Sequence, residues 1–224
     1  MITFKPHESF QYIKKYIPEK PVIVEAGAFD GHETQRMLAV WPEAIIHTFE
    51  PIPAVFKKLE ENTAHLPNVH RYQMALSDTT GNTPLYVAER PDRPGIPSQA
   101  SSLRMPKERL LYSPIQFPYT IDVPTITLDD WAQKFAVPQV DLLWLDMQGY
   151  ELDALTAAHT VLNHVSAIYT EVAFVESYLG QAQYPEVKAW LKQEGFVLIG
   201  GDFTEQPTKF FGNALFVKKE LMSK

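Results

Sequence analysis

The chain has 224 residues and no cysteine, and its 20 Lys and Arg residues against 27 Asp and Glu residues give a formal net charge of −7. The lack of cysteine excludes disulfide frameworks, thiolate zinc sites and cysteine nucleophiles. The acidic balance argues against duplex nucleic acid or an anionic membrane as the main partner, because both require a concentrated basic surface. The first residues show no signal-peptide pattern and no window is apolar enough to cross a bilayer, so we expect a soluble cytoplasmic protein.

Helical apolar spacing and short apolar runs bounded by Pro or Gly alternate along the chain. The predicted helices are 7–17, 32–41, 53–66, 127–135, 151–162 and 185–194. The predicted strands are 22–24, 44–49, 69–76, 140–145, 165–172, 196–200 and 210–217, with a hairpin arm at 83–88. This alternation predicts a single α/β domain over 1–224 with a mostly parallel sheet.

The stretch 89–120 breaks this pattern. It shows no clean periodicity and holds six of the 18 prolines. A loop of this length inside a compact domain is usually functional or mobile. We expect an irregular insertion over one end of the domain, placed as a lid over a substrate.

The first strand is followed by a turn that runs from Glu25 to Gly31. Gly27 and Gly31 bracket this turn, and glycine allows the backbone to approach a ligand closely. The dinucleotide fingerprint G-x-G-x-x-G is not met, because Phe29 and His32 stand where its later glycines belong. The turn alone is equally compatible with an ordinary strand-to-helix connection.

Glu50 ends the second strand about 20 residues beyond the glycine turn. A carboxylate at this position can accept hydrogen bonds from both ribose hydroxyls of a nucleoside. Together with the glycine turn it favours a ligand site over a solvated surface glutamate. Adenosine cofactors in general share both features, so the pair does not choose between them.

Asp146 follows the apolar strand 140–145, and Glu151 follows the short turn after it. A carboxylate at the end of a buried strand is costly unless it has a partner or a task. Asp146 and Glu151 could share a substrate hydroxyl or a divalent ion. Glu151 is also explained by the positive N-terminus of the next helix alone.

These motifs together resemble the FkbM-type S-adenosylmethionine-dependent methyltransferases. The resemblance runs in the family's order over residues 20–217. It rests on the segments 24–31 with Thr34, 49–51, 75–78, 101–103, 127–129, 141–151 and 213–217.

The resemblance implies a class I (Rossmann-like) methyltransferase sheet of seven strands flanked by helices, with the last strand antiparallel. It implies O-methylation of a hydroxyl on a sugar, polyketide or similar small metabolite, with S-adenosyl-L-methionine as the cofactor. By analogy, Glu25, Gly27 and Gly31 would line the methionine end and Glu50 would bind the ribose. The stretch 74–78 would lie at the adenine. The expected cofactor-binding residues are thus Glu25, Gly27, Ala28, Gly31, Glu50, Ala75, Leu76 and Ser77.

Asp146 is the candidate catalytic base, because a carboxylate can take the proton of an acceptor hydroxyl. The family often has Glu where this chain has Gln148, which favours a mechanism without a metal. Two rival hypotheses are a nicotinamide-dependent oxidoreductase and a non-catalytic module that binds an adenosine cofactor. The missing fingerprint glycines weaken the first, and the second leaves Asp146 without a task.

Overall fold

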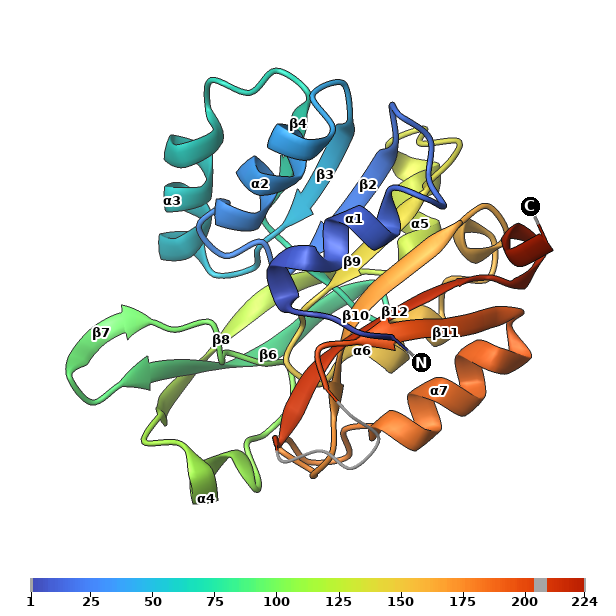
Figure 1. Ribbon diagram of the computed structural model, residues 1–224. Helices are drawn as coiled ribbons and strands as arrows, with labels where there is room; N and C mark the ends of the chain where they lie inside the picture. The colour runs from blue at the N-terminus through green and yellow to red at the C-terminus, as the bar shows by residue number, and fades with distance from the viewer. Residues whose placement is uncertain (1, 204–208, 224) are drawn as a thin grey trace.

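A computed structural model describes residues 2–203 and 209–223 of the chain. The main sheet has the strand order β1-β11-β12-β10-β9-β2-β3-β4 (Figure 1). Its strands are β1 (Ile2–Thr3), β2 (Val22–Ala26), β3 (Ile45–Phe49), β4 (Val69–Tyr72), β9 (Leu142–Leu145), β10 (Ala167–Ala173), β11 (Phe196–Gly201) and β12 (Phe211–Lys218). β12 pairs antiparallel with both β10 and β11, while the other pairings in this sheet are parallel.

This topology confirms the predicted Rossmann-like sheet, including its antiparallel last strand. Seven strands from β4 to β11 form the expected sheet, and the two-residue strand β1 adds an eighth at the edge beside β11. The central strands β2 and β9 are buried on both faces. Such burial explains why their sequences are continuous apolar runs rather than alternating patterns.

Helices cover both faces of the main sheet (Figure 1). The helices are α1 (Ser9–Ile13), α2 (His32–Val40), α3 (Pro53–Thr63), α4 (Arg109–Tyr112), α5 (Leu128–Lys134), α6 (Glu151–Thr156) and α7 (Tyr184–Gln193). Apolar residues of α1 and α2 pack on one face, and those of α5, α6 and α7 pack on the other. Among the described residues, no helix is long and apolar enough to pass through a bilayer.

A second sheet with the order β5-β8-β6-β7 extends beside the main sheet (Figure 1). Its strands are β5 (Ala75–Leu76), β6 (Gly81–Arg90), β7 (Arg93–Pro97) and β8 (Gln116–Ile126). The predicted strand 69–76 is therefore two strands, because the chain leaves β4 and enters this other sheet at β5. The hairpin arm expected at 83–88 is part of β6 and pairs with β8.

The expectation of irregular structure over 89–120 is wrong for a large part of that stretch. β7, α4 and the start of β8 all lie within it. The prolines argued against strands in this stretch, but the structure places them where a sheet can hold proline. Pro94 and Pro97 lie on the edge strand β7, and Pro118 lies where the β6–β8 register shifts. Edges and bulges are the positions where a sheet tolerates proline.

Several predicted helix boundaries also differ from the structure. The leading helix, expected at 7–17, is the short α1 preceded by a 3-10 turn at Pro6–Glu8. The helix expected at 151–162 ends at Thr156, and a separate 3-10 turn follows at Val161–Asn163. A further 3-10 turn at Lys219–Ser223 closes the described chain. Thr127 caps the start of α5, because its hydroxyl accepts a hydrogen bond from the Asp130 backbone N–H at 3.1 Å.

Candidate active site

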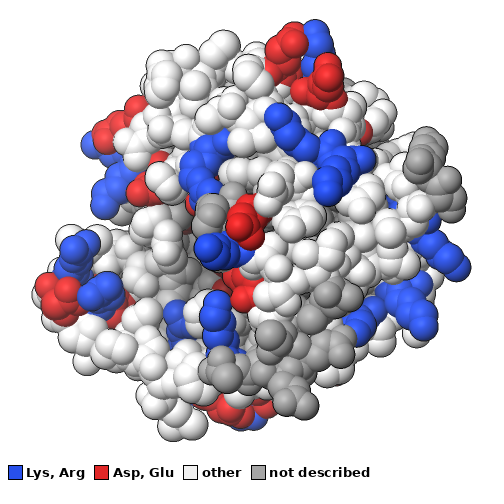
Figure 2. All heavy atoms as spheres, viewed as in Figure 1, with Lys and Arg blue, Asp and Glu red and all other residues white. Residues whose placement is uncertain are grey.

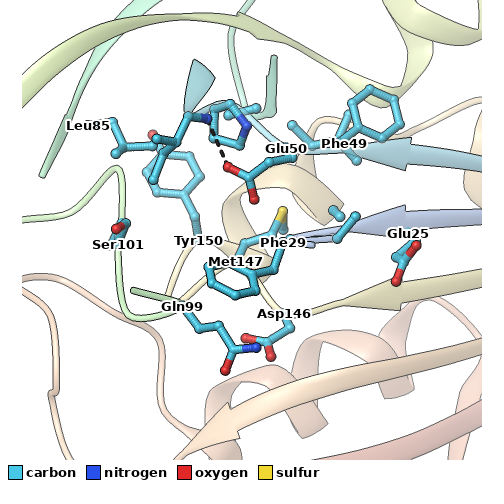
Figure 3. A pocket seen from close by; sticks show the side chains of 18 of the residues that line it. Glu25, Phe29, Phe49, Glu50, Leu85, Gln99, Ser101, Asp146, Met147 and Tyr150 are labelled. Atoms are coloured by element: carbon cyan, nitrogen blue, oxygen red, sulfur yellow. Dashed lines mark hydrogen bonds between the residues drawn. The ribbon is translucent and has the colours of Figure 1, made fainter. Parts of the chain in front are cut away.

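A pocket opens at the carboxyl ends of β2, β3 and β9, between the main sheet and the second sheet (Figure 3). This is the edge where ligands bind in open α/β sheets. The pocket is lined by residues from six stretches of the chain and by Leu85. The stretches contribute 25–30, 32–33, 49–52, 74–76, then 98, 99 and 101–103, and finally 144, 146, 147 and 150. The pocket therefore joins all three acidic strand ends with the second sheet and the segment that follows β7.

The turn after β2 is built around Gly27. Its φ of +84° lies in the left-handed region, and the backbone N–H groups of Gly27 and Ala28 both donate to the carbonyl of Phe49. A Cβ atom at Gly27 would lie 1.9 Å from the carbonyl oxygen of Asp146. Glycine is therefore required both by the backbone conformation and by the close approach of the chain at the end of β9.

Gly31 has a role in the fold rather than in the pocket wall. It precedes α2 with a φ of +84°. A Cβ there would lie 2.7 Å from a methyl group of Thr63 and 2.9 Å from Leu59, both on α3. Gly31 thus allows α2 and α3 to pack closely behind the turn, and its predicted contact with a cofactor stays a prediction.

Glu25 is buried beside α2, and its Oε2 accepts a hydrogen bond from the Thr34 hydroxyl at 2.5 Å. Burial raises the pKa of Glu25 to about 8, because desolvation disfavours the charged form and the Thr34 hydrogen bond offsets this only in part. Figure 3 shows Glu25 at the side of the pocket, away from the centre. Glu25 therefore connects the end of β2 to α2 through its hydrogen bond with Thr34.

Glu50 points into the pocket from the end of β3 (Figure 3). The backbone N–H of Ile52 donates to its Oε1 at 2.8 Å, and the backbone of Phe29 also contacts the carboxylate. Desolvation raises the pKa of Glu50 to about 8 against these hydrogen bonds. The protein thus fixes one carboxylate oxygen of Glu50, and the carboxylate lines the pocket. A carboxylate that binds two ribose hydroxyls would need such a position.

The stretch after β4 contributes an apolar wall. Ala75 and Leu76 line the pocket and both are buried, while their contact with the adenine stays a prediction. Ser77 follows β5 and is fully buried, and its N–H donates to the carbonyl of Ile126 at the end of β8. Its neighbour Asp78 accepts a hydrogen bond from the hydroxyl of Tyr150, whose ring lines the pocket.

Asp146 follows β9 and is open to the pocket (Figure 3). The side-chain amide of Gln148 donates to its Oδ1 at 2.7 Å. The pKa of Asp146 is raised, mainly because protein surrounds the carboxylate on most sides, while the Gln148 hydrogen bond acts in the opposite direction. This side chain combines access to a ligand with a raised proton affinity.

Two further carboxylates lie beside Asp146. Oxygen atoms of Asp146, Glu151 and Glu171 all lie within 4.8 Å of one another. Glu151 accepts hydrogen bonds from the N–H groups of Met147 and Gly149 at 2.8 to 3.2 Å, so it binds the turn that it closes. Burial raises the pKa of Glu151 to about 7 and the pKa of Glu171 well above its ordinary range, where the neighbouring carboxylates add to the effect.

Protein donors already bind part of this acidic group. Both oxygens of Glu151 accept hydrogen bonds from backbone N–H groups, and the Gln148 amide donates to one oxygen of Asp146 and to one oxygen of Glu171. The expectation of a mechanism without a metal stays a prediction.

The segment 98–104 forms a wall that is tied to the turn after β9. The Ser102 hydroxyl donates to the carbonyl of Gln148 at 2.7 Å, and Nε of Arg104 donates to the carbonyl of Gly149 at 3.0 Å. The same guanidinium binds both oxygens of Asp153 at 2.6 and 2.7 Å. The segment that follows β7 is thus connected to the Asp146 side of the pocket by several hydrogen bonds.

The structure brings most of the predicted site residues to one pocket. Glu25, Gly27, Ala28, Glu50, Ala75, Leu76 and Asp146 line it. Sequence reasoning missed Phe29, Gln99, Met147 and Tyr150 as pocket walls and Tyr178 behind them. Met147 and Tyr150 lie beside the candidate base in the chain, so their position was a usable signal. Tyr178 is distant from these residues in the sequence, and only the folding of the chain brings it beside Gln148.

Comparison with known proteins defines the class. The structure resembles a magnesium protoporphyrin IX methyltransferase (ChlM) from Synechocystis PCC 6803 with bound SAM, at a TM-score of 0.53 and 8% identity over 94% of this chain and 76% of that one. It also resembles SMU.1697c, a putative methyltransferase from Streptococcus mutans in complex with SAH, at a TM-score of 0.54 and 11% identity over 97% and 99% of the chains. The fold is that of the class I methyltransferases.

The family model "Methyltransferase FkbM domain" matches residues 25–198. The chain therefore belongs to the FkbM methyltransferase family. It is 32% identical to the 2-O-methyltransferase NoeI of Sinorhizobium fredii over 162 residues, which cover 72% of this chain and 67% of that protein. It is 26% identical to the methyltransferase sdnD of Sordaria araneosa over 203 residues, covering 80% and 75% of the two chains. The protein is an S-adenosylmethionine-dependent methyltransferase, and the rival hypothesis of a nicotinamide-dependent oxidoreductase is set aside.

Proposed function

We propose that the protein transfers a methyl group from S-adenosylmethionine to a hydroxyl of a small metabolite, with Asp146 as the base. The observation that carries this proposal is the Asp146 carboxylate at the end of β9, open to the pocket and held by the Gln148 amide. Asp146 and Glu50 lie on the same sheet edge, and the turn at Gly27 and Ala28, along which the cofactor would bind, lines the same pocket.

The pocket residues fit the cofactor. Glu50 would hold the ribose hydroxyls with the oxygen that Ile52 leaves available, and Ala75 and Leu76 would cover the adenine. The turn at Gly27 and Ala28 would lie along the methionine end. Bound S-adenosylmethionine supplies a methyl group on a positively charged sulfur, which leaves as a neutral thioether.

The chain then has two tasks at the acceptor. It must hold the acceptor oxygen in line with the methyl group and keep water out. Asp146 accepts the hydroxyl proton as the new carbon–oxygen bond forms, and its raised pKa makes it a stronger base than a free aspartate. The proton passes to solvent after the product leaves.

A small acceptor is supported by two observations. The relative NoeI is a 2-O-methyltransferase, a name that states methyl transfer to an oxygen atom. On the face seen in Figure 2, basic side chains lie in separate groups with uncharged surface between them, which is unlike the continuous basic surface that nucleic acids require. A hydroxyl on a sugar, polyketide or similar metabolite is the acceptor class we propose.

The test is single-turnover methyl transfer by Asp146→Asn on a panel of hydroxylated metabolites. Asparagine keeps the shape and the hydrogen bonding but removes the basicity, so methyl transfer should fall roughly 10²- to 10⁴-fold while cofactor affinity changes little. Asp122→Asn, at an exposed position of β8, is the matched control and should keep the wild-type rate. Methyl transfer by Asp146→Asn at the wild-type rate would remove the base from the proposal.

A further inference from the structure

Gln148 has an unusual backbone conformation for its residue type. Its φ of +54° lies in the left-handed region, and it is followed by Gly149 with a φ of +100°. Left-handed backbone is strained for residues other than glycine, and asparagine and aspartate tolerate it better than glutamine. The side chain is also buried, with 7% of the residue exposed. A strained backbone and a buried polar side chain are both unfavourable, so we expect the side chain of Gln148 to form specific hydrogen bonds beside Asp146.

The side-chain amide provides that contact. Its nitrogen lies 2.7 Å from Oδ1 of Asp146 and 3.3 Å from Oε2 of Glu171. An amide nitrogen carries two hydrogen atoms, so it can donate to both carboxylates at once. The amide oxygen cannot face an ionised carboxylate, and this fixes which end of the amide points to Asp146.

Tyr178 holds the opposite end of the same amide. Its hydroxyl lies 3.0 Å from Oε1 of Gln148 and 2.8 Å from the carbonyl oxygen of Ala100, and both of these atoms accept from its single proton. Tyr178 is almost fully buried, so its hydroxyl has little access to water as a substitute. The hydrogen bonds therefore run from the segment 98–104 through Tyr178 and Gln148 to Asp146.

The charges around Asp146 show why a neutral donor matters. Glu171 on β10, Glu151 on α6 and Glu33 on α2 are like charges, and Arg109 on α4 is the opposing one. Without the amide, an ionised Asp146 would face these carboxylates with one donor fewer.

We propose that Gln148 is a positioning residue for methyl transfer: its amide orients the Asp146 carboxylate toward the acceptor hydroxyl, and Tyr178 orients the amide. This inference rests on the proposed role of Asp146 as the base. Gln148 itself is buried and does not line the pocket, whereas its neighbours Asp146 and Met147 do.

The main test is Gln148→Met, which keeps the length of the side chain but removes both amide donors. The fold should tolerate this change, because the Ser102 hydroxyl still binds the carbonyl of residue 148. Methyl transfer should fall roughly 10- to 100-fold, because a small displacement of a reacting group from its productive position slows the reaction by about this much. Cofactor affinity, measured by calorimetry, should stay within about twofold of the wild type.

The pH profile separates a positioning role from a general loss of structure. Removal of the donor disfavours the ionised form of Asp146, so the acidic limb of the single-turnover pH profile should move to higher pH in Gln148→Met. Tyr178→Phe should move it in the same direction by a smaller amount, because the amide keeps its place but loses one orienting hydrogen bond. Gln133→Met, on the exposed side of α5, should leave rate and profile unchanged.

A double-mutant cycle with Asp146→Asn decides the matter. If Gln148 acts through Asp146, the Gln148→Met substitution should cause almost no further loss in the Asp146→Asn background. Equal losses in both backgrounds, or a wild-type rate in Gln148→Met and Tyr178→Phe, would overturn the inference while leaving the base in place. If Asp146→Asn alone keeps the wild-type rate, the proposed role of Asp146 as the base fails instead. Should Gln148→Met not fold, Tyr178→Phe carries the same cycle.

Discussion

Glu25 and Glu50 show how two buried acids of the same pocket differ at the scale of single residues. Both have a pKa raised to about 8 by desolvation. The hydroxyl of Thr34 binds Glu25 from within the protein, whereas Glu50 is turned to the pocket with one oxygen on the Ile52 amide. Glu50 is therefore the one whose ionisation a ligand can favour.

Glu50→Gln tests the ribose contact. Glutamine can still accept the Ile52 N–H, but it cannot form charge-assisted hydrogen bonds, so cofactor affinity should fall roughly 10- to 100-fold. In the wild type, affinity should rise as the pH increases through about 8, because binding by the ionised carboxylate requires loss of its proton. The variant should show a flat profile over the same range.

Calorimetric titration across pH 6 to pH 9 measures both effects. Glu61→Gln, an exposed position of α3 paired with Lys57, serves as the control and should bind like the wild type. Unchanged affinity in Glu50→Gln would assign Glu50 to the structure of the β3 turn and not to the cofactor.

The positions of Gly27, Glu50 and Asp146 could be predicted because each follows a buried strand, and parallel strands end at one edge of a sheet. The network around Asp146 could not be predicted in this way. Gln148 and Tyr178 are 30 residues apart in sequence. No periodic pattern links them, and only the packing of the segment after β10 against the turn after β9 brings them together.

At the scale of elements, the segment 98–104 forms one wall of the pocket. Its ties to the turn after β9 are the Ser102 and Arg104 hydrogen bonds and the contact of Ala100 with Tyr178. Arg104 also lies over the ring of Tyr150, 5.0 Å from its centroid. These contacts favour a fixed wall in the free protein, while the closing of a lid over the acceptor stays a prediction.

Hydrogen exchange tests the wall directly. Backbone amides of 98–104 should exchange more slowly than those of the β6–β7 hairpin tip before any ligand is added, because local stability follows local contacts. Arg104→Ala should increase exchange in 98–104 and weaken cofactor binding several-fold, since Tyr150 loses the guanidinium that covers it. Arg90→Ala, which removes an exposed ion pair with Asp92, is the control and should change neither. Fast exchange of 98–104 in the free wild type, slowed only by ligands, would support a mobile lid instead.

The second sheet marks the limit of prediction at this scale. The main sheet could be predicted because its strands are apolar runs between amphipathic helices. The strands β6 and β8 mix exposed and buried residues without a strict alternation, and Pro84 and Pro124 lie within their paired positions. Their pairing depends on contacts between distant parts of the chain, which local sequence patterns do not report.

At the scale of the whole molecule, the buried acids couple stability to pH. Glu25, Glu50 and Glu151 are each at most 5% exposed, and burial raises their pKa values to about 8, 8 and 7. In the unfolded chain a glutamate has a pKa of about 4.3. Between these values the folded protein holds protons that the unfolded chain has released.

The sign of the effect follows from this difference in bound protons. The contribution of these groups to stability is fully present below about pH 4.3 and is lost as the pH rises through the folded pKa values. The free energy of unfolding of the cofactor-free protein should therefore decrease from about pH 5 to about pH 8, by up to about 1.4 kcal/mol per pH unit for each group. The slope should level off above that range, where both states are ionised.

Glu25→Gln isolates one of these contributions. Glutamine remains neutral at every pH and can keep a hydrogen bond to Thr34, so the variant should lose part of the slope between pH 5 and pH 8 and gain stability relative to the wild type at the alkaline end. Urea unfolding of the cofactor-free protein at several pH values measures this, with Glu61→Gln on the exposed side of α3 as the control that should keep the wild-type slope. Stability of the wild type that rises from pH 5 to pH 8 would mean that these carboxylates are ionised in the folded protein. A slope unchanged by Glu25→Gln would mean that Glu25 releases its proton at the same pH in the folded and unfolded states.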